Sequence, residues 1–161
     1  MSPPIHLLYV AALLGFFSLP VKAQSMDQLV LACVPVERLG CGCSIRLNGV
    51  ACSNQEFPTQ PHLFTELERE APLFLHVGGK EQILPHTHHS GASLKGDSSG
   101  WFTDTYQSSE FEVQVRYSPG KNTCPKPKDE GCEYTDIATE VTIKLPSGIS
   151  FEYKGVGACG C

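Results

Sequence analysis

Apolar and polar residues alternate along much of the second half of the chain. In three segments hydrophobic side chains occupy every second position and polar side chains lie between them: residues 111–117, 141–145 and 149–153. Successive side chains of a β-strand point to opposite faces, so this period of two places the apolar side chains of each segment on one face. The pattern predicts three strands, each with one buried and one solvent-facing side.

The last two of these segments are joined by Pro146-Ser147-Gly148, which predicts a hairpin. A three-residue loop that ends in a left-handed glycine fits this sequence. Such a loop pairs Leu145 with Ile149 and keeps the apolar residues of both strands on one side. On the polar side Glu140 then lies opposite Lys154, which is a favourable cross-strand pair. A two-residue loop would mix the two faces, so we expect the three-residue register.

Shorter apolar runs predict further strands in the first two thirds of the chain. We expect them at Leu29–Val36, Ser44–Leu47, Val50–Ser53, Leu73–Val77, Gln82–Leu84 and Trp101–Tyr106. Asn48-Gly49 should join the second of these strands to the third as a hairpin, and Gly78-Gly79 should join the fourth to the fifth. Trp101, the only tryptophan, is expected to begin its strand as a core aromatic residue.

One short helix is expected over Pro61–Ala71. Its apolar stripe has helical spacing and consists of Leu63, Phe64, Leu67 and Ala71. Proline suits the first turn of a helix, and Pro72 ends the segment. Residues 55–60 and 86–100 have the composition of loops. Together these features predict an all-β fold: an antiparallel β-sandwich or small barrel with one short helix, stapled by disulfides.

The first 23 residues have the features of an export signal peptide. Residues 5–19 are mostly apolar but too short to span a membrane, and Val21-Lys22-Ala23 places small residues at the −3 and −1 positions of a cleavage site. Cleavage after Ala23 would remove 23 of the 161 residues and leave 138, which is the size of one ordinary domain. We therefore expect residues 24–161 to form a single domain that is periplasmic or secreted.

The charge balance limits the partners that the domain can have. The chain carries 12 basic and 17 acidic residues, a net charge of −5, and loss of Lys22 with the leader makes it −6. Nucleic acids and anionic membrane surfaces are bound by clusters of lysine and arginine. The composition therefore argues against both partners, and no segment beyond the leader is apolar enough over sufficient length to span a membrane.

The chain contains eight cysteines, all beyond the expected cleavage site: Cys33, Cys41, Cys43, Cys52, Cys124, Cys132, Cys159 and Cys161. An even number of cysteines in an exported domain favours disulfides over free thiols. Four of the cysteines form two Cys-Gly-Cys units at opposite ends of the mature chain. Eight cysteines allow about 105 pairings, so the bridges have to be assigned from local arguments.

Parity predicts how the two Cys-Gly-Cys units face. The second unit continues the odd-numbered apolar series of Ile149, and the first unit continues that of Ile45. Both units then direct two thiols toward the core, and the glycine between them leaves the opposite side free for close approach. Two near-parallel disulfides between the units are the economical arrangement, each closing a loop of about 120 residues. Gly155 and Gly157 weaken the strand that this argument needs.

A second cross-linked element is expected at Cys124–Cys132. A bridge there would close a stiff, exposed loop that contains two prolines and carries Lys126 and Lys128 at its tip. Rigid loops lose less entropy on binding, so this loop is a candidate contact element for a partner. The pair Cys33 and Cys52 then follows by elimination.

His86-Thr87-His88-His89 is the densest cluster of metal-ligating side chains. In extended backbone His86 and His88 share one side, and His89 joins them if the loop curls. Imidazole groups suit Zn²⁺ or Cu²⁺, although no carboxylate lies close by in the sequence. The alternative is a polar loop with solvated histidines. The thiolates of the two Cys-Gly-Cys units are a second candidate ligand set, for Zn²⁺ or Cu(I), if they are reduced.

Gly96-Asp97-Ser98-Ser99-Gly100 resembles the Gly-Asp-Ser-Gly-Gly nucleophile motif of trypsin-like serine proteases over five residues. Serine replaces the glycine that follows the nucleophile, and 138 residues are too few for the two barrels of that family. A connecting loop rich in serine and glycine fits the segment better. The carboxylates of the chain show no distinctive paired spacing.

These observations order three hypotheses about function. The first is an exported, non-enzymatic binding module that acts without a cofactor on a protein or other macromolecule outside the cytoplasm, as an inhibitor or an envelope accessory factor. The second is a periplasmic protein that binds zinc or copper through the histidine loop, with or without the Cys-Gly-Cys units. The third is a hydrolase of unknown type.

Overall fold

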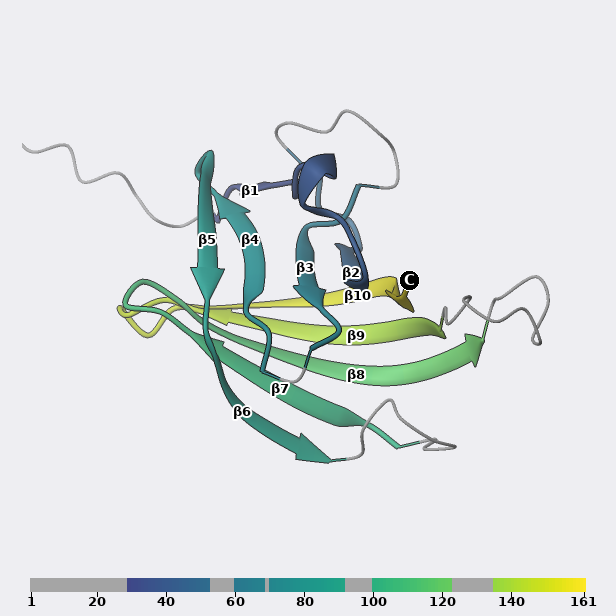
Figure 1. The fold of residues 1–161 in the computed structure, drawn as a ribbon. Helices are drawn as coiled ribbons and strands as arrows, with labels where there is room; N and C mark the ends of the chain where they lie inside the picture. The colour runs from purple at the N-terminus through teal and green to yellow at the C-terminus, as the bar shows by residue number, and fades with distance from the viewer. Residues whose placement is uncertain (1–28, 53–59, 69, 92–99, 123–134) are drawn as a thin grey trace, which may run out of the picture.

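The computed structural model describes residues 29–52, 60–68, 70–91, 100–122 and 135–161 (Figure 1). Within these ranges the chain forms strands, one turn of 3-10 helix and no α-helix. The elements are β1 (Leu31–Ala32), η1 (Val36–Arg38), β2 (Gly42–Leu47), β3 (Leu63–Glu66), β4 (Leu73–Val77), β5 (Lys80–Leu84), β6 (His86–Gly91), β7 (Phe102–Gln107), β8 (Glu112–Asn122), β9 (Thr135–Lys144) and β10 (Ser150–Gly160). The predicted antiparallel all-β fold is confirmed. The expected signal peptide, residues 1–23, lies outside the described ranges.

All the strands belong to one antiparallel sheet that curls into a half-barrel. The order is β1-β4-β3-β2-β10-β9-β8-β7-β6, and β5 pairs with β4. Strand β5 pairs along the whole of β4, whereas β3 and β1 follow one another along the opposite edge of β4. As Figure 1 shows, β3, β4 and β5 run crosswise to β8, β9 and β10. In the described part of the chain no helix is long and apolar enough to cross a membrane.

Pro85 links the two sides of the half-barrel. It alone separates β5, which pairs with β4, from β6, which pairs with β7 at the far end of the sheet. Proline cannot donate a ladder hydrogen bond and suits a bend between edge strands. The Pro85 carbonyl still accepts a hydrogen bond of 3.0 Å from the Gln107 amide. The bend therefore turns one continuous stretch of chain from one side of the half-barrel to the other.

The hairpin register predicted around Pro146-Ser147-Gly148 is confirmed. The Leu145 amide donates a 2.9 Å hydrogen bond to the Ile149 carbonyl, and Glu140 lies opposite Lys154. Gly148 adopts the left-handed conformation, with φ of 87°. Ile149 itself is 41% exposed, because it lies at the turn rather than over the core.

The alternating segments place apolar side chains of one face in the core, as predicted. The fully or almost fully buried side chains of β8 and β9 are Val113, Val115, Tyr117, Ile137, Val141 and Ile143. They pack against buried residues of β2, β3, β4 and β7 in one cluster, which the partly buried Phe151 and Tyr153 of β10 join. Val34, Phe64 and Phe74 form a smaller cluster on the other side of β3 and β4.

The helix predicted over Pro61–Ala71 is wrong, because this segment contains strand β3. Leu63 packs into the main core, whereas the next residue, Phe64, packs into the smaller cluster. A strand buried on both faces has a continuous apolar run, and a short run of this kind cannot be distinguished from a helical stripe by spacing alone.

Three other strand predictions need correction. After the Asn48-Gly49 turn the chain leaves the sheet, so Val50–Ser53 does not form a hairpin with β2, and its residues up to Cys52 are not in a strand. Strand β2 pairs instead with β10 and β3. The strand expected at Leu29–Val36 is limited to β1 and is followed by η1. Within the expected loop 86–100, the first six residues form β6.

Candidate functional site

Two parallel disulfides clamp the start of β2 to the end of β10. The strand register places Cys43 directly opposite Cys159, and disulfides join Cys43 to Cys159 and Cys41 to Cys161. The predicted bridging of the two Cys-Gly-Cys units is confirmed. The inner bridge lies in the core, with its cysteines 5% and 3% exposed. The outer bridge is exposed, contrary to the parity argument, because its cysteines lie beyond the paired residues of the two strands.

Glycines allow β10 to approach its neighbours closely through the clamp. A Cβ atom on Gly155 would lie 2.6 Å from the Thr139 hydroxyl, and one on Gly157 would overlap the Ser44 carbonyl oxygen. A Cβ atom on Gly42 would overlap the Thr65 carbonyl oxygen. The glycines at 155 and 157 therefore do not end the strand, as the sequence suggested, but permit β10 to pack between β9 and β2.

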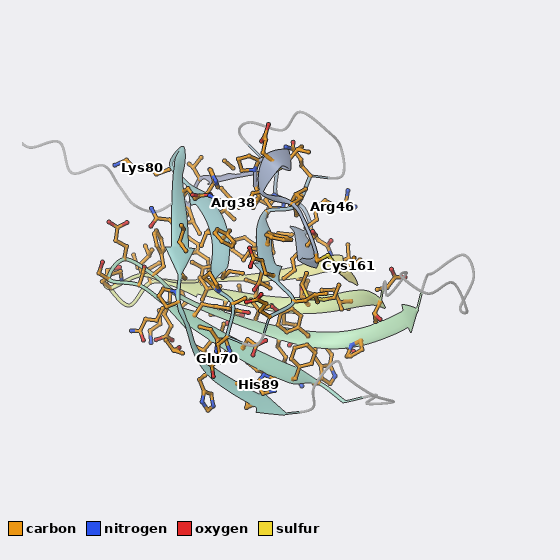
Figure 2. All side chains as sticks on the ribbon, viewed as in Figure 1. Arg38, Arg46, Glu70, Lys80, His89 and Cys161 are labelled. Carbon is orange, nitrogen blue, oxygen red and sulfur yellow. A yellow bond between two sulfur atoms is a disulfide. The ribbon has the colours of Figure 1, made fainter. Side chains whose placement is uncertain are left out.

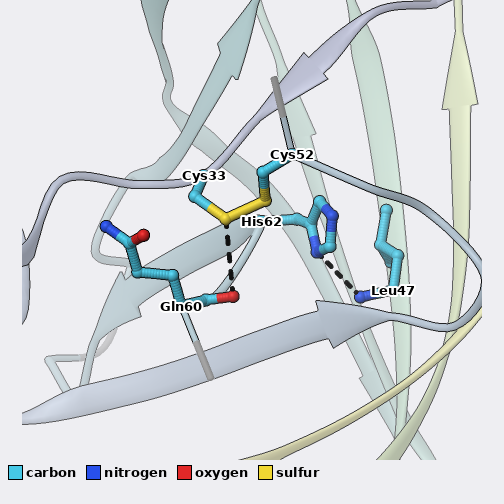
Figure 3. Close-up of a disulfide and its surroundings, with 5 residues drawn as sticks. All are labelled: Cys33, Leu47, Cys52, Gln60 and His62. Atoms are coloured by element: carbon cyan, nitrogen blue, oxygen red, sulfur yellow. Dashed lines mark hydrogen bonds between the residues drawn. A yellow bond between two sulfur atoms is a disulfide. The ribbon is translucent and has the colours of Figure 1, made fainter. Parts of the chain in front are cut away.

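A third disulfide joins Cys33 to Cys52, as predicted by elimination (Figure 3). The Cys33 residue is fully buried, and its sulfur contacts the Gln60 carbonyl at 3.6 Å. The three bridges fit an oxidising compartment outside the cytoplasm. The expected bridge Cys124–Cys132, with Lys126 and Lys128 in its loop, lies outside the described residues, as does the Gly96-Asp97-Ser98-Ser99 part of the serine-rich segment.

Two of the three predicted metal-ligating histidines share one carboxylate. Asp104 of β7 places its Oδ1 atom 3.1 Å from His86 Nε2 and 2.6 Å from His89 Nδ1. A bulge at Thr87 shifts the register of β6, so that His86 faces Tyr106 and His89 faces Asp104. The bulge therefore brings two histidines that are three residues apart to the same side of the sheet.

His88 does not join them. It pairs in register with Thr105, which lies between Asp104 and Tyr106 and so points to the opposite face. In the described ranges no group of three or more histidine, cysteine, aspartate or glutamate residues is arranged to hold a metal ion. The Cys-Gly-Cys units are not thiolate ligands in this structure, since all four sulfurs are in disulfides.

The shared carboxylate was missed by the sequence reasoning, although the sequence contains a sign of it. Asp104 lies between Phe102 and Tyr106 on the core-facing side of β7, where an apolar residue is expected, and its register partner is the fully buried Val115. Its side chain is only 15% exposed. A charged residue at a core-facing position needs a partner, and the histidines supply it.

Aromatic rings line the same face beside the histidines. The His86 ring meets Tyr106 edge-on at 5.4 Å, and the His89 ring lies 5.8 Å from Phe102. Phe102 in turn stacks on Tyr117 at 4.5 Å. Burial, with the negative charge of Asp104 as a second cause, raises the pKa of Tyr106 to about 12. Burial also raises the pKa of Tyr117 well above its ordinary value. The hydroxyl groups of Tyr106 and Tyr117 therefore stay protonated.

The outer face of the same strands carries an exposed aromatic residue. Trp101 is 41% exposed, which corrects the expectation of a core residue. The Arg116 guanidinium lies 4.3 Å from the centre of its ring and donates a 3.1 Å hydrogen bond to Glu140. The Arg116 side chain, which is paired with Glu140, thus covers one face of the tryptophan ring.

No protein-family model, no curated protein and no solved structure matches the chain.

Proposed function

We propose that the protein is an exported, non-enzymatic binding module that contacts another protein outside the cytoplasm through the outer face of its sheet. The observation that carries the proposal is the exposed Trp101 with Arg116 fixed over its ring. Tryptophan and arginine are the residue types that most often dominate binding energy at protein interfaces. A pre-ordered pair also loses little conformational entropy on binding.

Trp101 begins a row of small or apolar residues that crosses the strands. It precedes Phe102, the register partner of Tyr117, and so lies beside Ser118. From there the register runs to Ala138 and on to Val156, which is 43% exposed. We call these four positions, Trp101, Ser118, Ala138 and Val156, the outer stripe. Trp101, Ala138 and Val156 are exposed and Ser118 is half-buried, and exposed apolar side chains grouped on a polar sheet are a feature of interaction surfaces.

The charges beside the outer stripe indicate the chemistry of the partner. The adjacent cross-strand row contains Arg116, Glu140 and Lys154, so it carries two positive charges and one negative charge. This local balance is opposite in sign to the net charge of −5 of the whole chain. A partner surface with apolar side chains bordered by carboxylates would match both the stripe and the row. Strands β8 and β9, which carry most of these residues, are also the strands that residues 123–134 connect, so Lys126 and Lys128 stay candidates for the same interface.

The test uses a second exposed hydrophobic residue as a control. Ile83 of β5 is 51% exposed but lies on a strand that does not contribute to the outer stripe. Tagged wild-type protein, Trp101→Ala, Arg116→Gln and Ile83→Ala are each used to capture proteins from the extracytoplasmic fraction of the producing cells, and the captured partner is then titrated. We expect Trp101→Ala and Arg116→Gln to weaken its binding at least about tenfold, and Ile83→Ala to leave it unchanged.

Three results would contradict the proposal. Capture of the same proteins by all four forms would show that the outer stripe is not the contact surface. Loss of binding in Ile83→Ala as well would indicate a general effect of exposed hydrophobic residues. Loss of binding in Lys126→Glu with Lys128→Glu, but not in Trp101→Ala, would move the interface to the 124–132 segment.

Metal binding is the second candidate function, and the observation that favours it is the shared carboxylate. Asp104 Oδ1 lies 3.1 Å from His86 Nε2 and 2.6 Å from His89 Nδ1, so three potential ligand atoms are already close together. A Zn²⁺ or Cu²⁺ ion would enter by replacing the two hydrogen bonds between the histidines and Asp104. Titration with ZnCl₂ should then raise the thermal midpoint in the wild type and in His88→Ala, but not in Asp104→Asn. An unchanged midpoint in the wild type would exclude this function.

A further inference from the structure

We infer that a pocket at the Asn48-Gly49 turn is a binding site for a carboxylate group. The pocket has a volume of about 320 Å³, which is at the lower end of the range for small-molecule sites. The polar side chains in its lining are Arg46, Asn48, Gln60 and His62. It lies on β2 and the chain next to β3, away from the histidine pair of β6.

His62 is the central observation, because it is a buried polar residue with an unused donor. The side chain is 2% exposed, and its Nδ1 atom accepts a 3.1 Å hydrogen bond from the Leu47 amide. In a neutral imidazole the proton then resides on Nε2. That nitrogen is buried and has no hydrogen-bond partner of good geometry in the described residues. A buried donor without an acceptor is costly, so an acceptor from a ligand would be favoured here.

The imidazole of His62 is held in its neutral form. Burial is the main cause that lowers its pKa from 6.5, and the positive charge of Arg46 lowers the pKa further. A hydrogen bond with the Val50 backbone raises the pKa in part, but its geometry is too poor to count as a full partner for Nε2. At neutral pH the pocket therefore offers an uncharged N–H donor at its wall and a guanidinium nearby, a combination that suits an anionic oxygen acceptor.

The walls of the pocket are fixed, which distinguishes it from a chance surface depression. The His62 amide donates a 2.8 Å hydrogen bond to the Ile45 carbonyl, and the Val34 amide donates one of 2.9 Å to the Pro61 carbonyl. The disulfide Cys33–Cys52 ties the chain after the turn to the segment that follows β1. Figure 3 shows the His62 ring between this disulfide and Leu47, with its second nitrogen turned away from the disulfide. The donor is thus pre-oriented before any ligand arrives.

The experiment compares carboxylates with uncharged analogues of the same shape. The probes are acetate against acetamide, galacturonate against galactose, and triglycine against its C-terminal amide. They represent a free organic acid, an acidic sugar and a peptide terminus, so the pattern of binding identifies the source of the carboxylate. Protein labelled with ¹⁵N-histidine reports the Nε2 resonance of His62 directly. We expect at least one carboxylate to shift this resonance saturably, and its uncharged analogue to leave it unchanged.

Variants away from His62 test the charge without removing the hydrogen bond to Leu47. Arg46→Gln should weaken binding about tenfold, the loss of one charge-assisted contact. Lys80→Gln is the matched control, since Lys80 is exposed on β5 and lies on the other side of the molecule in Figure 2. It should bind as the wild type does. The inference is overturned if no carboxylate shifts the His62 resonance, if the uncharged analogues shift it equally, or if both variants lose the same affinity.

Discussion

The parallel disulfides Cys41–Cys161 and Cys43–Cys159 should behave as one cross-link against unfolding. Their sequence separations are 120 and 116 residues, so they close almost the same loop. In the chain-entropy model a loop of this length reduces the freedom of the unfolded chain by about 5 kcal/mol. Once either bridge is present, the other closes only a ring of a few residues, which the same relation values at about 2 kcal/mol.

Three variants measure this coupling. Replacing the exposed outer pair with serine should lower the free energy of unfolding by about 2 kcal/mol. Replacing the buried inner pair with alanine should cost the same entropy term and, in addition, a loss of packing in the core. Removing both pairs should cost about 7 kcal/mol before packing, which exceeds the sum of the two single-pair entropy losses by about 3 kcal/mol. That total is comparable to the whole stability of an ordinary domain, about 5–15 kcal/mol.

Equilibrium unfolding in urea, followed by circular dichroism at neutral pH, gives all three free energies. The bridge Cys33–Cys52 is the control, since it closes a separate loop with a separation of 19 residues. Its removal should cost about 3 kcal/mol and should add simply to the loss of the outer bridge. If removal of both clamping bridges cost no more than the sum of the two separate removals, the single-cross-link reasoning would be refuted. A loss of about 5 kcal/mol on removing the outer bridge alone would refute it as well.

Three further outcomes follow from the described residues. Gly157→Ala should destabilise the protein by about 3 kcal/mol in urea unfolding, because the new Cβ would overlap the Ser44 carbonyl. The control Gly40→Ala should be close to neutral, since nothing lies within 4 Å of the position that its Cβ would take. Burial raises the pKa of Tyr106 from 10.0 to about 12, so the neutral phenol contributes about 3 kcal/mol to the free energy of unfolding below pH 10, and this contribution is lost as the pH rises toward 12. Phenolate absorbance of the folded protein should therefore show that Tyr106 ionises above pH 10. Ionisation of Tyr106 near pH 10 in the folded protein would contradict this. Because burial lowers the pKa of His62 below 6.5, the unfolded chain binds the proton first as the pH falls, and stability in urea should decrease below pH 6.5; a stability that did not change there would show that His62 is not neutral in the fold.

The sheet could be predicted where a single face of a strand is buried. Residues 112–117 of β8, 141–144 of β9 and 150–153 of β10 alternate strictly in polarity. The turn at Pro146-Ser147-Gly148 sets the register of β9 and β10, because its length leaves one arrangement that keeps the faces separate. The pairing of the Cys-Gly-Cys units was predicted as well, although only the inner bridge points into the core as parity required. Local sequence determines these features, so reasoning from local sequence recovered them.

The prediction failed where the partner of a segment, rather than its own pattern, decides the structure. Strand β3 is buried on both faces and therefore has no alternation to detect. Strand β6 is mostly exposed and polar, and it is a strand because β7 supplies its hydrogen bonds. The Asn48-Gly49 turn has hairpin composition, but β10 and β3 occupy the two edges of β2 that a hairpin partner would need.

The candidate sites could be predicted only in part from the sequence, for a related reason. His86 and His89 were singled out, but the bulge at Thr87 that aligns them and the carboxylate of Asp104 that joins them depend on the register with β7. The sequence did not indicate His62 as a site residue, because a lone histidine beside Pro61 belongs to no recognisable motif. Its unused donor becomes apparent only when the hydrogen bond from Leu47 assigns its tautomer.

The seam between β2 and β10 connects the two proposed binding surfaces. The outer stripe ends at Val156 of β10, and the register partner of Val156 on β2 is Arg46, which lines the carboxylate pocket. The disulfides that join Cys43 to Cys159 and Cys41 to Cys161 hold the same two strands together. Separation of β2 from β10 would displace one end of the stripe and one wall of the pocket at once. Under the proposed function the clamp would have a role beyond stability: it would keep both surfaces in fixed positions relative to each other, so that their contacts form at low entropic cost.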